Sequence, residues 1–302
     1  MKRNDLTQYF IEFSHKMMKN SNMNEDNIIS PDNVFQEAIT TNRELLAEMM
    51  RKGHLEGSTI LGAQNIKNLD TLAQNGKSCI VFCEHVSNLD VPSIFIRFKD
   101  YNEKSFIDIF DKFIFIAGLK LNQNPFVKMF AEIFSRLVIY PIRTIHNLEL
   151  DPTKKEELDL SKKINFSATR KLMELKSKNK IFVLFPTGTR YRSWDPSSAK
   201  GMKETMAYLS IFENFCCCSI SGNNMQVAKH EDMTNEKFEE DVLVLNFGEV
   251  TNSKEFIKKI SEENKNCSDK NQLRQIQVDE IMKVIESLHK EGDTYRNKFL
   301  ND

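Results

Sequence analysis

The sequence predicts an α/β fold, in which a mixed central sheet flanked by helices is preceded by a small all-helical N-terminal domain. Two observations predict it. From Cys79 onward, short apolar runs of strand length alternate with segments of helical periodicity, which is the pattern of an α/β domain. Before Cys79, the apolar residues recur at helical spacing. We therefore expect a helical domain over residues 1–74 and an α/β domain over residues 75–302.

The N-terminal segment predicts three helices. Apolar residues at helical spacing indicate the first one over residues 6–18. The stretch Ser30-Pro31-Asp32 predicts the start of a second helix, with serine as N-cap and proline at the first helical position, and this helix should end near Gly53. A third helical pattern covers residues 59–74 and closes at Asn75-Gly76.

The rest of the chain predicts strands and helices in alternation. Apolar runs predict strands at residues 79–83, 113–117, 137–141, 181–185, 215–220 and 242–247. Helical patterns fall at residues 91–97, 125–134, 165–176 and 200–208. The highly charged segment 149–163 predicts a solvated excursion or a short linker. Two amphipathic segments, 256–260 and 273–288, predict helices that cover the sheet.

Composition limits the class of protein. Hydrophobic residues make up 40% of the 302 residues and charged ones 28%, which is ordinary for a globular protein with a sizeable core. The net charge of −1 gives no general basic character that would favour nucleic acid. No apolar stretch reaches the roughly 18 residues of a membrane span, and no apolar signal core follows the first residues. We expect a protein that is soluble or peripheral to a membrane.

The six cysteines do not predict a metal site or a redox motif. None is arranged as Cys-x-x-Cys, and no histidine falls at the spacing of a zinc finger. The run Cys216-Cys217-Cys218 predicts small apolar residues on a buried strand. Without a secretory signal, a reducing intracellular compartment is the default.

A first candidate site follows the apolar run 79–83, which ends in a polar turn that carries His85 and Asp90. A turn of this length allows the aspartate to come back onto the imidazole ring. An aspartate that accepts the Nδ1 proton fixes the tautomer and leaves Nε2 as a general base. The alternative from these residues alone is a loop histidine bonded to a nearby carboxylate.

A second candidate site follows the run 181–185, where the chain continues as Pro186-Thr187-Gly188-Thr189-Arg190-Tyr191-Arg192. Gly188 permits a tight or left-handed backbone. If this stretch is extended, Arg190 and Arg192 point to the same side and offer forked donors to a phosphate. The alternative is that both arginines form salt bridges with Asp or Glu at the surface.

The ordered pair His-x4-Asp and Phe-Pro-x-Gly-x-Arg resembles the glycerolipid acyltransferases, and in particular the soluble, chloroplast-type glycerol-3-phosphate acyltransferases. Three further segments are similar to that group: Phe-Ile-Ala-Gly-Leu-Lys at 115–120, Tyr-Pro-Ile-Arg-Thr at 140–144, and Arg-Tyr-Arg-Ser-Trp-Asp-Pro at 190–196. The resemblance covers roughly residues 75–248, and it also implies a small helical N-terminal domain.

The resemblance implies transfer of a fatty acyl group from a thioester of acyl carrier protein or coenzyme A to the 1-hydroxyl of glycerol 3-phosphate, with no other cofactor and no metal. It makes His85 the general base and Asp90 the residue that orients it. The acceptor hydroxyl is itself the nucleophile, in agreement with the lack of a Gly-x-Ser-x-Gly elbow. The resemblance assigns Arg143, Arg190 and Arg192 to the phosphate of the acceptor. Lys120, Gly188 and Thr189 are further candidates at this site, and the alternative for Lys120 is a solvated lysine at the end of a strand.

Some positions depart from the family. Thr144 follows Arg143 where the family has a second basic residue, and Glu84 stands where the wider family often has asparagine. A carboxylate at position 84 could raise the pKa of His85 or point into solvent. Thr187 stands where membrane-bound relatives often have glutamate, in agreement with the soluble group.

Several readings remain open. The apolar product implies transient contact with a membrane, so we expect a cytoplasmic protein that is peripheral at the inner membrane face and does not bind nucleic acid. A lysophosphatidate acyltransferase, a metal-dependent phosphoesterase with His85 and Asp90 as ligands, and a non-catalytic lipid- or phosphosugar-binding module are the alternatives. The sequence does not decide the acyl donor, the chain length, the oxyanion donors or the oligomeric state.

Overall fold

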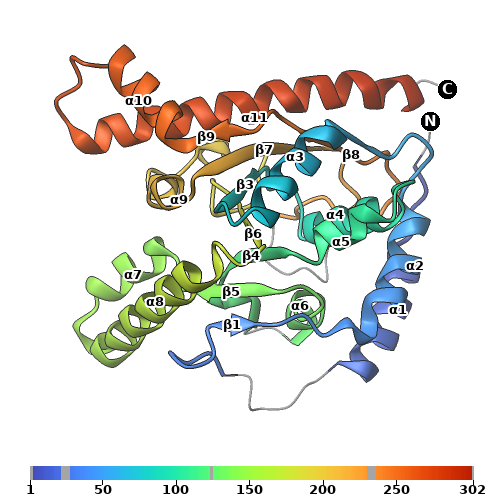
Figure 1. The fold of residues 1–302 in the computed structure, drawn as a ribbon. Coiled ribbons are helices and arrows are strands. Elements are labelled where there is room, and N and C mark those ends of the chain that lie inside the picture. The colour runs from blue at the N-terminus through green and yellow to red at the C-terminus, as the bar shows by residue number, and fades with distance from the viewer. Residues whose placement is uncertain (1–2, 22–27, 123–124, 230–235, 301–302) are drawn as a thin grey trace.

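The computed structural model describes residues 3–21, 28–122, 125–229 and 236–300, and a mixed sheet lies at its centre (Figure 1). Its strands are β1 (Phe35–Gln36), β2 (Thr59–Leu61), β3 (Cys79–Cys83), β4 (Phe113–Gly118), β5 (Arg136–Ile139), β6 (Ile181–Leu184), β7 (Asn214–Ser221), β8 (Val244–Phe247) and β9 (Thr251–Asn252). Their order is β1-β5-β4-β6-β3-β7-β8-β2, with β9 beside β7. Strands β5, β4, β6, β3 and β7 are parallel to one another. β1 is antiparallel to β5 and β8 is antiparallel to β7, whereas β2 is parallel to β8.

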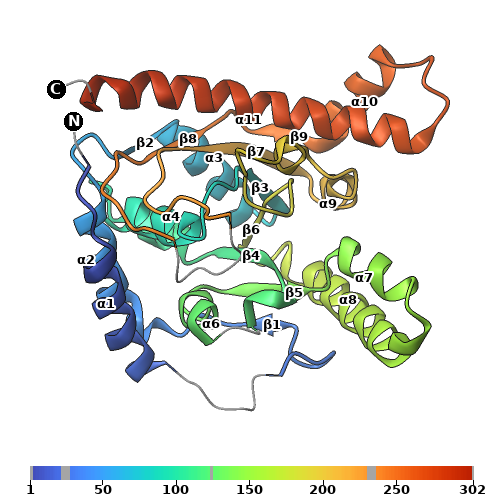
Figure 2. The same cartoon turned by 180° about the vertical axis from the view of Figure 1, so that it is seen from behind.

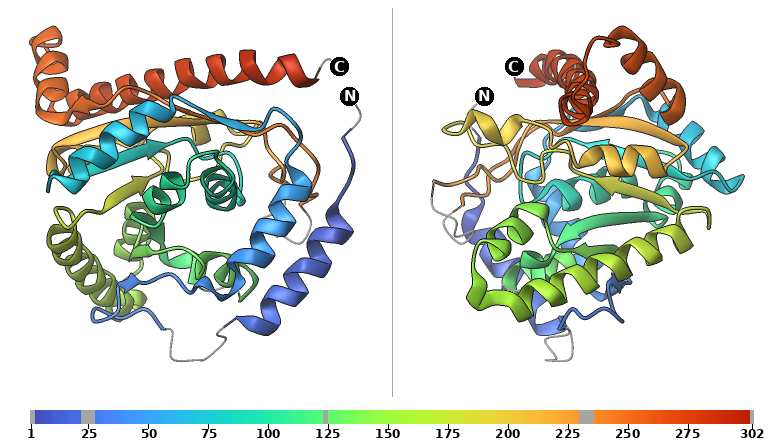
Figure 3. Two further views of the ribbon diagram at one scale, coloured as in Figure 1. Left: turned by 45° about the vertical axis from the view of Figure 1, so that its right-hand side comes forward. Right: turned by 90° about the vertical axis from the view of Figure 1, so that its left-hand side faces the viewer.

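Helices cover both faces of this sheet (Figures 2 and 3). They are α1 (Thr7–Asn20), α2 (Arg43–Gly53), α3 (Ala63–Gln74), α4 (Asp90–Lys99), α5 (Ser105–Phe110), α6 (Pro125–Ala131), α7 (Ile142–Glu149), α8 (Lys155–Leu175), α9 (Thr205–Ile211), α10 (Ser253–Glu263) and α11 (Lys270–Leu300). Short 3-10 helices are η2 (Thr40–Asn42), η3 (Leu119–Asn122), η4 (Pro152–Lys154) and η5 (Pro196–Ala199). The predicted α/β class with a mixed sheet flanked by helices is confirmed.

The side chains of β3 alternate between two hydrophobic cores, because successive residues of a strand point to opposite faces of a sheet. Val81 belongs to the core on one face, which includes Phe95 of α4, whereas Phe82 belongs to the core on the other face, which includes Ile281 of α11. All five residues of the strand are buried, as the apolar run predicts. The same alternation sends the side chain of residue 84 toward α11 and that of residue 85 toward α4.

The N-terminal segment is not all helical, so this part of the prediction was wrong. Strand β1 pairs with β5 and strand β2 pairs with β8, so residues 35–36 and 59–61 belong to the sheet. The predicted second helix begins only at Arg43. The Ser30 N–H donates to Asn33 Oδ1 at 2.7 Å, so the serine–proline signal opens a turn instead of a helix. The predicted boundary between domains 1–74 and 75–302 stays a prediction.

The charged segment 149–163 is also different from its prediction as a linker. Most of it forms η4 and the first turns of α8, which begins at Lys155. Ser161, Ile164 and Ala168 are buried at helical spacing, and the charged residues take the solvent side. The predicted helices over residues 256–260 and 273–288 are confirmed within the longer α10 and α11.

Candidate active site

The predicted site segments follow four neighbouring parallel strands. His85 follows β3, Arg190 and Arg192 follow β6, Lys120 follows β4, and Arg143 follows β5. These strands lie in the order β5-β4-β6-β3, and the carboxyl ends of parallel strands share one edge of a sheet. The structure therefore brings all four segments to the carboxyl edge, with the loop of β6 directly beside that of β3.

His85 and Asp90 make the contact that their spacing predicts. The Nδ1 atom of His85 lies 2.7 Å from Asp90 Oδ2, which also accepts the Val86 N–H at 2.8 Å. Asp90 is buried at the first position of α4, where the helix dipole stabilises a carboxylate. An anionic partner on Nδ1 favours the tautomer with its proton on that nitrogen.

The second ring nitrogen of His85, Nε2, has no described partner. The ring stacks on Phe185 with 4.3 Å between the two ring centroids. The backbone oxygen of His85 accepts the Tyr191 N–H at 2.8 Å. The side chain keeps 23% of its surface exposed, and Nε2 has no hydrogen bond to any residue that the structure describes. With the proton on Nδ1, Nε2 carries the lone pair that a general base needs.

Gly188 gives the turn after β6 its shape. Its φ is +62°, in the left-handed region, and its N–H donates to Phe185 O at 3.0 Å. A Cβ at this position would come within 2.7 Å of Met202 Cε, so glycine also suits the space. Thr187 Oγ donates to the carbonyl of Thr189 at 2.6 Å, which closes the turn. The tight backbone predicted at Gly188 is confirmed.

Arg190 is held by a residue that sequence reasoning missed. Its guanidinium lies 2.6 Å from Glu236 Oε1, and the Asn88 side-chain amide donates to Glu236 Oε2 at 2.9 Å. The Glu236 side chain is only 1% exposed, so the pair is almost fully buried. Glu236 thereby links the turn after β3 to the turn after β6. No local pattern marked this residue, because it follows Arg190 by 46 positions.

Removal of the Glu236 carboxylate should destabilise the protein strongly. Glu236→Ala leaves the guanidinium of Arg190 buried without its counter-charge, and breaking a buried pair in this way costs about 3 kcal/mol or more. Urea denaturation measures the loss. The control is Glu286→Ala, which breaks an exposed pair with Lys290 and should leave the unfolding free energy almost unchanged. Equal effects of the two substitutions would contradict the assignment.

The structure gives fewer side-chain contacts for the other residues that the sequence predicts to bind a phosphate. Arg143 lies on α7 with an exposed side chain, and β4 separates its strand from β6. Arg192 is half-buried, and its backbone N–H donates to Ser198 Oγ at 2.8 Å. The backbone of Lys120 belongs to η3, but its side chain lies outside the described residues. The assignment of these residues to a phosphate stays a prediction.

Glu84 does not bond to His85, and its carboxylate is held by other partners instead of pointing into solvent. Its Oε2 accepts the Ile220 N–H at 2.9 Å and lies 2.8 Å from His289 Nδ1. The Nε2 atom of His289 lies 3.3 Å from Asp293 Oδ2, so both ring nitrogens face carboxylates. The bond to Glu84 raises the pKa of His289, in spite of burial. Both His85 and His289 lie beside carboxylates, but only His85 has a ring nitrogen that faces no described carboxylate.

The raised pKa of His289 gives stability a dependence on pH. The charged form is favoured in the folded state, so its contribution is complete below the unfolded pKa of about 6.5 and is lost as pH rises through the higher folded pKa. We expect the difference in Tm between the wild type and His289→Gln to become smaller as the pH rises from about 6 to about 9. Calorimetry at several pH values measures it. A difference that does not depend on pH would contradict the charge assignment.

The cysteine run lies inside the sheet. Cys216, Cys217 and Cys218 are buried on β7, as predicted for small apolar residues. Burial raises the pKa of Cys217 to about 12, so its thiol is a poor nucleophile at neutral pH. In the described part of the chain, no three His, Cys, Asp or Glu side chains are grouped as metal ligands would be.

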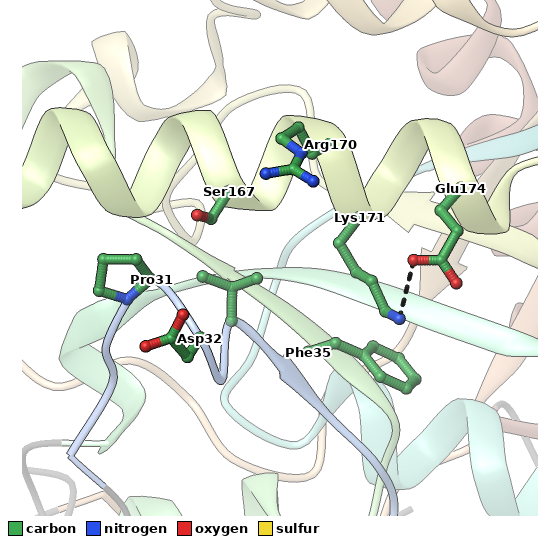
Figure 4. A pocket seen from close by; sticks show the side chains of 8 residues that line it. Pro31, Asp32, Phe35, Ser167, Arg170, Lys171 and Glu174 are labelled. Carbon is green, nitrogen blue, oxygen red and sulfur yellow. Dashed lines mark hydrogen bonds and ion pairs between the residues drawn. The ribbon is translucent and has the colours of Figure 1, made fainter.

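Two cavities lie along α8, away from the residues described above. One of about 550 Å³ is lined by the segment 31–35 and by α8 between Ser167 and Glu174, where Lys171 pairs with Glu174 (Figure 4). The other, of about 390 Å³, continues along α8 past Phe166. None of the predicted site residues lines either cavity.

The sequence matches no protein-family model, and a search of curated proteins found no match. The structure is similar to the crystal structure of the 1-acyl-sn-glycerophosphate (LPA) acyltransferase PlsC from Thermotoga maritima. The TM-score is 0.42 at 17% sequence identity, over 94% of this chain and 93% of the other. A likeness of this degree does not decide the activity, which the site residues must support by themselves.

Proposed function

We propose that this protein is an acyltransferase in which His85 is the general base. The observation that carries the proposal is the Nδ1 contact of His85 with buried Asp90, which leaves Nε2 without a described partner on a partly exposed ring at the carboxyl edge. Nε2 takes the proton of an acceptor hydroxyl while the hydroxyl oxygen attacks the carbonyl carbon of a thioester. Collapse of the tetrahedral intermediate breaks the carbon–sulfur bond, and the imidazolium returns the proton to the departing thiolate. Asp90 stabilises the imidazolium during this step.

The acceptor that we propose is glycerol 3-phosphate, acylated at its 1-hydroxyl, with a thioester of acyl carrier protein or coenzyme A as the donor and no further cofactor. Positive charge near His85 supports a phosphorylated acceptor. Arg143 and Arg192 follow β5 and β6 at the edge where His85 lies, and neither side chain is paired with a described carboxylate. Arg190 would add to this site if a phosphate replaced Glu236 as its partner. Lys120, Gly188 and Thr189 stay further candidates for the same phosphate site.

A thiol-release assay tests the activity and the acceptor together. The wild-type protein is given acyl-carrier-protein or coenzyme A thioesters with glycerol 3-phosphate, with 1-acylglycerol 3-phosphate, or without acceptor. Turnover that depends on glycerol 3-phosphate supports the proposal and identifies the donor. Turnover only with 1-acylglycerol 3-phosphate would make the protein a lysophosphatidate acyltransferase. Binding of either acceptor without thiol release would favour the non-catalytic module.

We also propose that the carboxyl edge touches a membrane surface, at the cytoplasmic face. Large apolar side chains are exposed in the segments after β4, β5 and β6, namely Leu121, Ile142, Leu150, Tyr191 and Trp194. Tryptophan and tyrosine favour the interface between lipid and water. None of the described helices is long and apolar enough to span a bilayer. Such an edge would let the acyl chain pass between the site and the lipid.

Trp194 reports this contact, since it is the single tryptophan of the chain and 41% exposed. We expect its fluorescence to shift to the blue with anionic vesicles and to be quenched by brominated lipid. Leu150→Asp, at the same edge, should weaken vesicle binding about tenfold, because a charge replaces an inserted apolar group. Val284→Asp, on α11, is the control and should bind normally. Unquenched fluorescence in the wild type would contradict the proposed contact.

A further inference from the structure

The residue that precedes His85 is tied to the long C-terminal helix. Glu84 Oε2 lies 2.8 Å from His289 Nδ1, and 205 positions separate the two residues in the chain. The side chains are 22% and 32% exposed, so the contact is half-buried between the sheet and α11. It lies on the face of the sheet opposite to His85, because β3 sends residues 84 and 85 in opposite directions.

The same carboxylate oxygen also holds β3 to β7. It accepts the Ile220 N–H at 2.9 Å, and the Glu84 N–H donates to Cys218 O at 2.9 Å. Glu84 therefore bonds to β7 through its backbone and its side chain, and to α11 through its side chain. Movement of this carboxylate would act on the backbone from which His85 projects.

α11 packs closely against the end of β7. Ser221 Oγ donates to the carbonyl of His289 at 3.1 Å, and a Cβ on Gly292 would come within 2.5 Å of Ser221 Oγ. The helix therefore cannot slide here without a clash or a lost bond. The imidazole of His289 is set between Glu84 from β3 and Asp293 from its own helix, with Arg296 beyond them bonded to Asp241.

We propose that His289 is a positioning residue of the active site. Its bond to Glu84 fixes the backbone at the end of β3, and with it the direction in which the His85 ring meets Asp90 and Phe185. Opposite charges on the ring and on Glu84 strengthen this bond, in agreement with the raised pKa of His289. The inference rests on the proposed function only where activity is the readout.

The experiment combines histidine NMR with kinetics on the full-length chain. The variants are His289→Ala, which removes the donor, and His289→Gln, which keeps an N–H that can reach Glu84. Lys290→Ala is the control, since its partner is Glu286 on the same helix. The first readout is the downfield Nδ1 proton of His85 bonded to Asp90, followed through a pH titration. The second is kcat and KM for acyl transfer.

We expect His289→Ala to shift this resonance and its titration midpoint, and to lower kcat about tenfold with little change in KM, since a small misplacement of a base acts on the chemical step. His289→Gln should restore most of both, and Lys290→Ala should change neither. If His289→Ala lowers Tm but leaves the His85 resonance and kcat unchanged, His289 only fastens α11 and the inference is wrong.

Two further outcomes also test the inference. If His289→Ala does not fold, Glu84→Gln weakens the same bond from the other side and is read in the same way, with an unchanged His85 resonance counting against the inference. If the wild type transfers no acyl group to any acceptor, the proposed function fails. The resonance of His85 still decides whether His289 positions it.

Discussion

His85→Ala should lower kcat for acyl transfer by roughly 10²–10⁴-fold, because the acceptor hydroxyl would lose the base that takes its proton. The acceptor KM should change little, since in the proposed mechanism the ring would contact the hydroxyl and not the phosphate. Thiol release under saturating donor measures the effect. The fold should survive, because the ring is partly exposed and the Val86 N–H still donates to the buried Asp90 carboxylate when the ring is removed.

Two controls separate the loss of the base from a general disturbance. His146→Ala removes an exposed histidine of α7 that faces Glu149, and it should keep wild-type turnover. His85→Gln keeps a side-chain donor that can reach Asp90, but it cannot accept a proton at neutral pH, so it should be as slow as the alanine variant. An alanine variant within about tenfold of the wild type would remove His85 from the role of general base.

Asp90→Asn should lower kcat by about 10³-fold while most of the fold remains. Asp90 Oδ2 both contacts Nδ1 of His85 and accepts the Val86 N–H, so an asparagine oxygen in that place keeps both bonds but brings no negative charge. The ring then keeps its proton on Nδ1, but the imidazolium that forms when Nε2 takes the proton of the hydroxyl has lost its anionic partner. The loss of a negative charge at the start of α4 should destabilise the protein by only about 1 kcal/mol.

Nitrogen NMR of the imidazole identifies the cause directly. In the wild type and in Asp90→Asn the resonances should both report a proton on Nδ1. Asp90→Glu, in which the longer carboxylate can still reach the ring, should recover part of kcat and keep the wild-type tautomer. A slow Asp90→Asn variant with its proton on Nε2 would show that Asp90 acts by fixing the tautomer and not through its charge.

The sequence by itself determined the parts of this protein that depend on neighbours in the chain. The apolar run of β3 can only be buried on both faces, and it is. The contact of His85 with Asp90 spans five positions, and the tight turn at Gly188 depends on one backbone angle. Such features form under local geometric limits, so spacing and residue type are enough to predict them.

Only the tertiary structure decided the contacts between distant parts of the chain. Glu236 meets Arg190, and His289 meets Glu84, because the strands and α11 bring them side by side, and no local pattern records that path. Strand β2 is too short to show a period, so the sequence pattern predicts a helix over its residues. The signal at Ser30 suits a turn as well as a helix start, and pairing of the following residues with β5 decides between them.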